Sequence, residues 1–170
     1  MPSLYTIRAL DPDSERELST ITCFSQMTIW ESRPELRVDP RDLPGYGWPE
    51  TLQRYRVGCR SPDQRYLVAV DPDGNLVGTS IVVIRTDLRN ARFGYFWSRY
   101  VLPAHRRHGL ARQFLGDSMS WFRSRGAGYA EVHIHVENKA LRSLFEKRGF
   151  KVVDRGNDTR WSWLVMRADL

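Results

Sequence analysis

One short stretch constrains the fold more than any other part of the chain: residues 101–112, with the sequence V-L-P-A-H-R-R-H-G-L-A-R. An apolar and aromatic run, residues 94–101, leads into it, and Pro103 ends that run because proline has no N–H to donate to a strand ladder. Gly109 lets the backbone approach a ligand closely, and a helical pattern begins at Leu110. The first turn of a helix leaves backbone N–H groups unpaired, and these form a site for an anion such as a diphosphate. The stretch therefore predicts a strand, an anion-binding loop and a helix, in that order.

Two other phosphate loops are excluded. The chain has no G-K-S/T sequence of a P-loop, and the single glycine of this stretch cannot satisfy G-x-G-x-x-G. Arg106, Arg107 and Arg112 add fixed positive charge at the predicted loop.

The pattern V-L-P-x-x-R-x-x-G-x-A resembles the acyl-CoA pyrophosphate loop of the GNAT superfamily of N-acetyltransferases. Its core is Arg or Gln, two residues, Gly, one residue, and Gly or Ala, and Arg106, Gly109 and Ala111 fill those places. The alternative is an arginine-rich turn that opens an ordinary helix. The resemblance implies that the following residues contact the cofactor acetyl-CoA: Arg106, Arg107, His108, Gly109, Leu110, Ala111 and Arg112.

A second stretch, residues 138–150, supports the same family. Its pattern N-x-x-L-x-x-L-F-E-K-x-G-F resembles the second GNAT motif, N-x-x-A-x-x-L-Y-E-K-x-G-F. The resemblance places Asn138 and Phe145 among the cofactor contacts. Phe145 stands where the family often has a tyrosine that protonates the departing thiolate, and phenylalanine has no proton to give. The loss is tolerable, because a thiol of pKa about 8.5 is a fair leaving group that water can protonate.

Hydrophobic periodicity and turn signals predict the remaining elements. We expect strands over residues 4–9, 66–70, 76–85, 94–102, 129–136, 151–154 and 161–167. We expect helices over residues 13–27, 50–58, 110–125 and 138–148. Together with the resemblance, which covers residues 66–170 well, they imply an α/β (α+β) fold. This is a GNAT-like central mixed, mostly antiparallel sheet of six to seven strands flanked by about four helices, in a single domain over residues 1–170.

Composition excludes several classes of protein. A chain that is 41% hydrophobic and 27% charged is ordinary globular material, and its apolar runs are too short to span a bilayer. We expect no signal peptide, and Cys23 and Cys59 lack the C-x-x-C spacing of a metal site, so we expect a reducing cytoplasm and no metal. The net charge of +6 would suit nucleic acid or a polyanionic cofactor. No nucleic-acid-binding signature is present, which favours the cofactor.

Residues 28–50 follow no periodic pattern. Three aromatic residues there (Trp30, Tyr46 and Trp48) are interleaved with Glu31, Glu35, Asp39 and Asp42. This composition suits recognition of an amine or of a peptide N-terminus. It equally suits a loop whose aromatic residues cover the core.

The strand at residues 129–136 carries the candidate catalytic residues. Alternation places Glu131, His133 and His135 on one face. His133 lies five residues before Asn138, the spacing at which relatives that acetylate protein N-termini keep a glutamate. The resemblance therefore suggests His133 as the general base, with His135 as its assistant or as a substrate contact. Both histidines could instead be ordinary residues of a strand surface.

The family also implies the rest of the reaction. The backbone N–H of Val101 is the usual partner of the thioester carbonyl. His105 and His108 are expected to contact cofactor or solvent rather than to act as acids. We expect acetyl transfer from acetyl-CoA to a primary amine, which is a protein N-terminus, a lysine or a small molecule.

Because residues 94–102 hold no carboxylate or histidine and Phe145 replaces tyrosine, a non-catalytic acyl-CoA-binding module stays open. A third class is an arginine-rich nucleic-acid binder. A homodimer is compatible with the sequence.

Overall fold

The computed structural model describes residues 4–32, 48–157 and 162–170. The backbone forms two compact units, which we treat separately: unit 1 is Met1–Ile81 with Ser98–Phe114, and unit 2 is Val82–Trp97 with Leu115–Leu170. The expected single domain over residues 1–170 stays a prediction.

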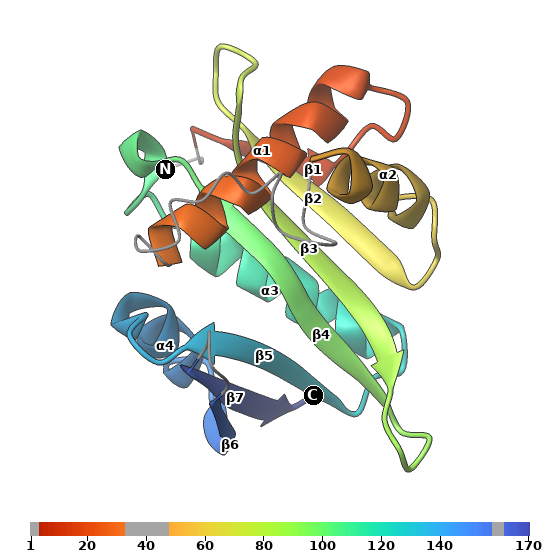
Figure 1. Ribbon diagram of the computed structural model, residues 1–170, viewed down its shortest axis with the longest axis vertical. Helices are drawn as coiled ribbons and strands as arrows, with labels where there is room; N and C mark the ends of the chain where they lie inside the picture. The colour runs from red at the N-terminus through yellow and green to blue at the C-terminus, as the bar shows by residue number, and fades with distance from the viewer. Residues whose placement is uncertain (1–3, 33–47, 158–161) are drawn as a thin grey trace. The chain divides into compact units, whose positions relative to one another are not determined.

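Within the described residues, seven strands form one mixed sheet in the order β1-β2-β3-β4-β5-β7-β6 (Figure 1). Strand β1 pairs antiparallel with β2, β4 pairs parallel with β5, and β7 pairs antiparallel with both β5 and β6. This confirms the predicted fold class. The strands are β1 Thr6–Ala9, β2 Gln64–Val70, β3 Leu76–Thr86, β4 Arg92–Val101, β5 Tyr129–His135, β6 Lys151–Asn157 and β7 Ser162–Asp169.

Four α-helices accompany the sheet in the described part of the chain: α1 Glu15–Ser32, α2 Trp48–Gly58, α3 Leu110–Ser124 and α4 Lys139–Glu146. The predicted end of the first helix near Met27 is wrong, because α1 continues for five more residues. The hydroxyls of Thr28 and Ser32 donate to the carbonyls of Phe24 and Thr28, at 3.0 and 2.7 Å, so polar residues extend the helix without an apolar stripe.

The bounds of α1 and α2 place some of the aromatic and acidic residues of the stretch 28–50 in helices. Trp30 and Glu31 belong to α1, and Trp48 opens α2. Tyr46, Glu35, Asp39 and Asp42 lie outside the described residues, so their predicted part in substrate recognition stays a prediction.

Unit 1 packs helices on both faces of its strands. On one face, α3 supplies Leu110 and Phe114 to an apolar cluster with Leu67, Ala69 and Val77. The other face carries aromatic contacts with α1 and α2. The ring centroids of Phe24 on α1 and Tyr100 lie 5.4 Å apart, and those of Tyr55 on α2 and Tyr66 lie 5.6 Å apart. The strand alternation of period two therefore sends neighbouring side chains to different helices.

Unit 2 buries one face of its strands under the second half of α3 and under α4. The ring of Phe96 on β4 makes edge-on contacts with three other rings of this core. Its centroid lies 5.2, 5.1 and 6.1 Å from the ring centroids of Phe122, Phe145 and Phe150. The remaining strand residues of this core are Val82, Ile84, Ala130, Val132, Ile134, Leu164, Met166 and Ala168. The predicted apolar face of residues 129–136 is thereby confirmed for the three β5 members of that list.

Gly94 in β4 gives a test of this packing. A Cβ atom there would lie 2.2 Å from Cγ of Phe122, whose side chain is fully buried. We expect Gly94→Ala to lower the free energy of unfolding by about 1–3 kcal/mol. Gly128→Ala is the control, because its nearest neighbour would be the Arg92 oxygen at 4.0 Å. Denaturant titration should show almost no change for the control, and equal stabilities of the two variants would contradict this packing.

Candidate functional site

The predicted anion-binding loop lies in unit 1, between the end of β4 and the start of α3. Pro103–His105 forms a single 3-10 turn, and the Leu102 N–H donates to the Val77 oxygen at 2.9 Å. Arg107 and Gly109 then adopt positive φ angles of 68° and 85°. These two left-handed residues turn the chain from the strand into the helix.

The start of α3 presents its backbone to solvent. At Gly109 a Cβ would meet nothing within 4 Å, so the space beside the backbone is open. The first helical hydrogen bond is from the Gln113 N–H to the Gly109 oxygen at 3.0 Å. The N–H groups of Leu110, Ala111 and Arg112 precede it, in the position where helices bind anions.

The charges around this turn fit a polyanion. Arg107, His108 and Arg112 are exposed, and neither arginine forms an ion pair with any other residue that the structure describes. Open backbone at Gly109, N–H groups at a helix start and two guanidinium groups without an ion pair among the described residues are together suited to a diphosphate.

Arg106 forms contacts within unit 1, and its expected contact with the cofactor stays a prediction. Its Nε donates to the Val101 oxygen at 2.8 Å, and its Nη2 donates to Oε2 of Glu31 at 2.6 Å. The guanidinium lies 5.4 Å from the centroid of the Tyr100 ring, and the Tyr100 hydroxyl donates to Oε1 of Glu31 at 2.6 Å. The Arg106 side chain thus links the loop to Val101 of β4 and to Glu31 of α1. Glu31 also accepts from Tyr100 of β4.

His105 and His108 lie against Tyr5, ahead of β1. The Tyr5 hydroxyl is 3.2 Å from Nδ1 of His105, and the two histidine rings meet the Tyr5 ring edge-on at 5.7 and 5.8 Å. These contacts position the loop, while the expectation that both histidines contact cofactor or solvent stays a prediction.

The predicted base, His133, lies in unit 2 where two parallel strands stop pairing. The β4–β5 register runs from Phe93↔Tyr129 to Phe96↔Val132, so His133 is the first residue of β5 beyond it. Its side chain is 42% exposed, and its Nε2 lies 2.9 Å from Oε1 of Glu131. The Tyr95 ring meets it edge-on at 5.3 Å.

Glu131 is buried, and both of its oxygens are engaged. While Oε1 faces His133, Oε2 accepts from Nε of Arg167 on β7 at 2.7 Å. Strand pairing places Arg167 directly opposite Glu131. The structure therefore joins a histidine, a carboxylate and a guanidinium on the face of unit 2 opposite its apolar core.

The other predicted residues of unit 2 have structural contacts. His135 accepts the Glu137 N–H at its Nδ1, at 3.3 Å. Asn138 caps α4, because its side chain accepts the Leu141 N–H at 3.1 Å. Phe145 is 1% exposed and packs against Phe96 and Phe150. A side chain so buried offers almost no surface to a ligand, so we correct the assignment of Phe145 to the cofactor contacts and place it in the core.

Three contact residues escaped the sequence analysis in the roles that the structure gives them: Tyr95, Arg167 and Glu131 as a partner of His133. Tyr95 and Arg167 are the cross-strand neighbours of Glu131, and only the strand order brings them together. Glu131 alone carried a signal, since it shares a strand face with His133.

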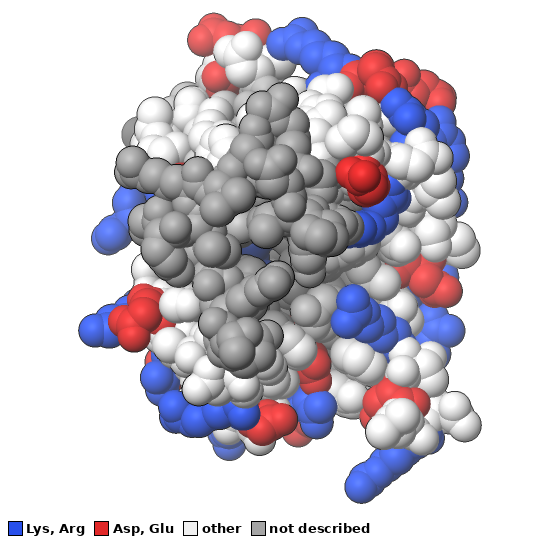
Figure 2. Space-filling view, in the orientation of Figure 1, with Lys and Arg blue, Asp and Glu red and all other residues white. Residues whose placement is uncertain are grey.

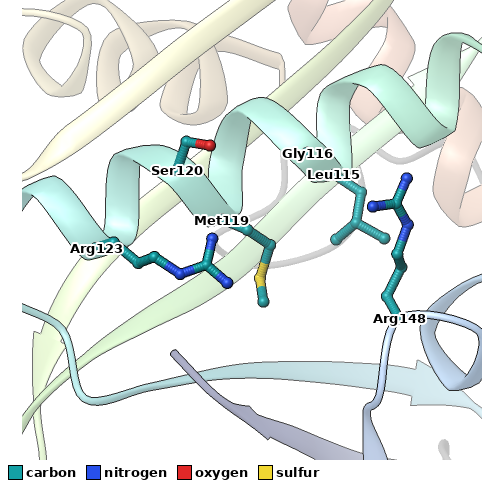
Figure 3. A pocket seen from close by; sticks show the side chains of 6 residues that line it. All are labelled: Leu115, Gly116, Met119, Ser120, Arg123 and Arg148. Atoms are coloured by element: carbon teal, nitrogen blue, oxygen red, sulfur yellow. The ribbon is translucent and has the colours of Figure 1, made fainter.

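A cavity of about 250 Å³ lies elsewhere in unit 2, and none of the predicted catalytic or cofactor residues lines it. Figure 3 shows its wall on α3, with Arg148 reaching in from the segment after α4.

On the visible face of each unit, Figure 2 shows acidic and basic side chains interspersed. No described helix is long and apolar enough to cross a membrane. Among the described residues, no three His, Cys, Asp or Glu side chains are grouped as metal ligands would be.

The comparison with family models agrees with the loop and the fold. The model of the Acetyltransferase (GNAT) family matches residues 26–150. The chain belongs to this family. Membership agrees with acetyl-CoA as the co-substrate, as the resemblance implied.

Relatives are similar over different lengths of this GNAT chain. GCN5-related N-acetyltransferase 6, chloroplastic, of Arabidopsis thaliana is 34% identical over 65 residues, which is 38% of this chain and only 23% of that relative. The structure of PaiA N-acetyltransferase from Thermoplasma acidophilum in complex with coenzyme A has a TM-score of 0.75 at 17% identity, covering 98% of this chain and 99% of that chain. A chain of the NatC complex bound to Gag peptide and CoA has a TM-score of 0.71 at 16% identity, covering 98% of both chains. At these identities the two structures show the fold.

The contact of Tyr100 with Glu31 predicts a measurable titration. Burial, followed by the hydrogen bond to the Glu31 carboxylate, raises the pKa of Tyr100 to about 12. Glu31→Gln removes the negative charge that opposes the phenolate. We therefore expect the Tyr100 pKa to fall, while burial keeps it above the ordinary value of about 10.

NMR of tyrosine labelled at Cζ would follow this titration. Glu50→Gln, an exposed site in the first turn of α2, is the control that should leave the Tyr100 midpoint in place. A Tyr100 resonance that titrates identically in wild type and Glu31→Gln would show that this contact does not form in solution.

Proposed function

We propose that this protein transfers the acetyl group of acetyl-CoA directly to a primary amine. The loop before α3 carries the proposal, because it has open backbone at a left-handed glycine, helix N–H groups and exposed arginines at one place. Coenzyme A contains a diphosphate, which is the anion that such a turn suits.

The loop residues hold the acetyl donor in this proposal. The N–H groups at the start of α3 and the side chains of Arg107 and Arg112 bind the diphosphate. Arg106 supports the loop through Glu31 and Val101. The Val101 N–H donates to the thioester carbonyl and so favours attack on it. Asn138 keeps its amide NH₂ group to donate to the cofactor, since the N-cap contact uses its oxygen.

His133 removes the proton from the acceptor. An alkylammonium has a pKa of about 10, so a base is needed to release the free amine near neutral pH. The imidazole is partly exposed and lies just past the last β4–β5 pair, where an acceptor can reach it. His135 lies two residues further on, where it assists the base or contacts the acceptor.

No side chain is assigned as the acid. Phe145 is buried and has no proton, so solvent protonates the thiolate. The acceptor is a protein N-terminus, a lysine or a small amine. The bound Gag peptide of the NatC structure supports a peptide acceptor. Free Cys23 and Cys59 support a reducing compartment such as the cytoplasm.

A non-catalytic acyl-CoA-binding module is the second candidate, favoured by the buried Phe145. Release of free thiol from acetyl-CoA in the presence of a panel of amines and peptides separates the two. A binding module would hold acetyl-CoA and release no thiol with any acceptor.

The left-handed Gly109 allows a direct test of the loop. Gly109→Ala adds a methyl group that strains a φ of 85° and lies beside the bound phosphates. We expect CoA affinity, measured by calorimetry, to fall at least about tenfold and the free energy of unfolding to fall by about 1–2 kcal/mol.

Gly126→Ala is the matched control for this variant. Gly126 also has a positive φ, of 72°, and a Cβ there would also meet nothing within 4 Å. It should lose similar stability and keep normal CoA affinity, because Gly126 ends α3 rather than beginning it. Unchanged CoA affinity in Gly109→Ala would make that glycine a simple helix boundary.

The assignment of His133 predicts a large kinetic effect. His133→Ala should lower kcat/KM by about 10²–10⁴-fold, with CoA affinity close to normal. The acidic limb of the pH–rate profile should disappear or move towards the pKa of the amine. His133→Gln should lose as much activity, since an amide can still donate to Glu131 but cannot take up a proton. If both variants stay within a few-fold of wild type, His133 is not the base.

A further inference from the structure

The proposed base has a buried carboxylate beside it that the reaction does not otherwise use. We propose that Glu131 is the positioning residue of His133: it holds the neutral imidazole as the Nε2–H tautomer, so that Nδ1 is the atom that takes the proton of the acceptor. This rests on the proposed function, because it assigns the atoms of that base.

Hydrogen-bond chemistry determines the tautomer. Glu131 Oε1 lies 2.9 Å from Nε2 of His133, and an ionised carboxylate can only accept. Nε2 must therefore donate, and in the neutral ring the lone pair is left on Nδ1. The opposite tautomer would place two acceptors against each other.

Arg167 is the counter-ion of the Glu131 carboxylate. Glu131 is only 8% exposed, and a buried carboxylate needs a positive partner and hydrogen-bond donors. Arg167 Nε donates to the other oxygen at 2.7 Å, and this hydrogen bond raises the pKa of Arg167. The guanidinium also lies 5.0 Å from the centroid of the Tyr129 ring. Each carboxylate oxygen thus has one donor, and Oε1 remains directed at the imidazole.

The imidazole of His133 also contacts Tyr95. Its ring meets the imidazole at 90°, and the Arg85 guanidinium lies 3.8 Å above the same tyrosine. Further charges of unit 2 lie one contact away: Asp87 accepts from the Tyr129 hydroxyl at 3.1 Å, and Lys151 pairs across the strands with Arg167. Glu131 is the one carboxylate among these groups that touches the ring.

In the proposed step, His133 takes one proton from the acceptor. The N–H bond of the acceptor ammonium breaks, its electron pair stays on the amine nitrogen, and a new Nδ1–H bond forms. The positive charge moves onto the imidazolium, where Glu131 stabilises it. Solvent later removes the proton, since the His133 side chain is 42% exposed.

Two substitutions should act in opposite directions. Glu131→Gln removes the negative charge beside the ring, so the midpoint at which the imidazolium forms should move to lower pH than in wild type. Arg167→Ala removes the positive charge that shares the carboxylate, so the midpoint should move to higher pH. A general loss of structure would not produce opposite shifts. Glu146→Gln is the control, because Glu146 pairs with Arg142 at 2.7 Å on α4, away from the ring.

The experiment combines ¹⁵N NMR of histidine side chains with pH–rate profiles of the full chain. In wild type, the His133 signals should show the Nε2–H tautomer, and Glu131→Gln should give a mixture of both tautomers. The acidic limb of kcat should shift with the NMR midpoint in each variant. Glu131→Gln should also lower kcat by about 10–100-fold while the KM for acetyl-CoA stays close to normal, because the ring then often presents the wrong nitrogen.

Two results would overturn the inference: an Nδ1–H tautomer in wild type, or a tautomer and midpoint that Glu131→Gln leaves unmoved. Either could occur in an active acetyltransferase, so the proposed function would survive. Conversely, full activity of His133→Ala would refute the base and its assigned atom, even with the expected NMR spectrum. The tautomer and the catalytic role are therefore read from different measurements.

Discussion

The parallel pairing of β4 with β5 is the constraint on which the polar cluster around His133 in unit 2 depends. It runs from Phe93↔Tyr129 to Phe96↔Val132 and then stops. Phe96 is anchored at this point by the rings of Phe122, Phe145 and Phe150. Past it, β5 continues to His133. Backbone groups that leave a parallel ladder need other partners, and the ends of parallel strands are where ligands are commonly bound.

Two glutamates with little exposed surface show how the molecule compensates for burying charge. Glu17 at the start of α1 accepts from both Arg8 and the Asp11 N–H, and these hydrogen bonds lower the pKa of Glu17. Glu131 is held by Arg167 in a similar way, but its second oxygen meets a histidine in place of a backbone N–H. The first carboxylate stabilises a helix start. The second is available to act on a titratable ring, which is the physical reason for assigning it a part in the reaction.

Phe145 fills a position of the second motif in the core, but it has no hydroxyl that could donate a proton. Its ring fills the centre of unit 2 between Phe96 and Phe150. A tyrosine there would need a partner for its hydroxyl, whereas phenylalanine fits an apolar site without that cost. In the proposed reaction, protonation of the departing thiolate is therefore left to solvent.

The sequence by itself determined the order of the elements, the turn from strand to helix at Gly109 and the family, because proline, glycine and hydrophobic period act locally along the chain. It also placed His133 on the polar face of its strand. Only the tertiary structure decided that Arg106 binds Glu31, that Phe145 is buried, and that Tyr95, Glu131 and Arg167 surround His133. The physical reason is that these contacts join residues on neighbouring strands or on separate elements. Strand order and register, which no local pattern encodes, select the partners of each side chain.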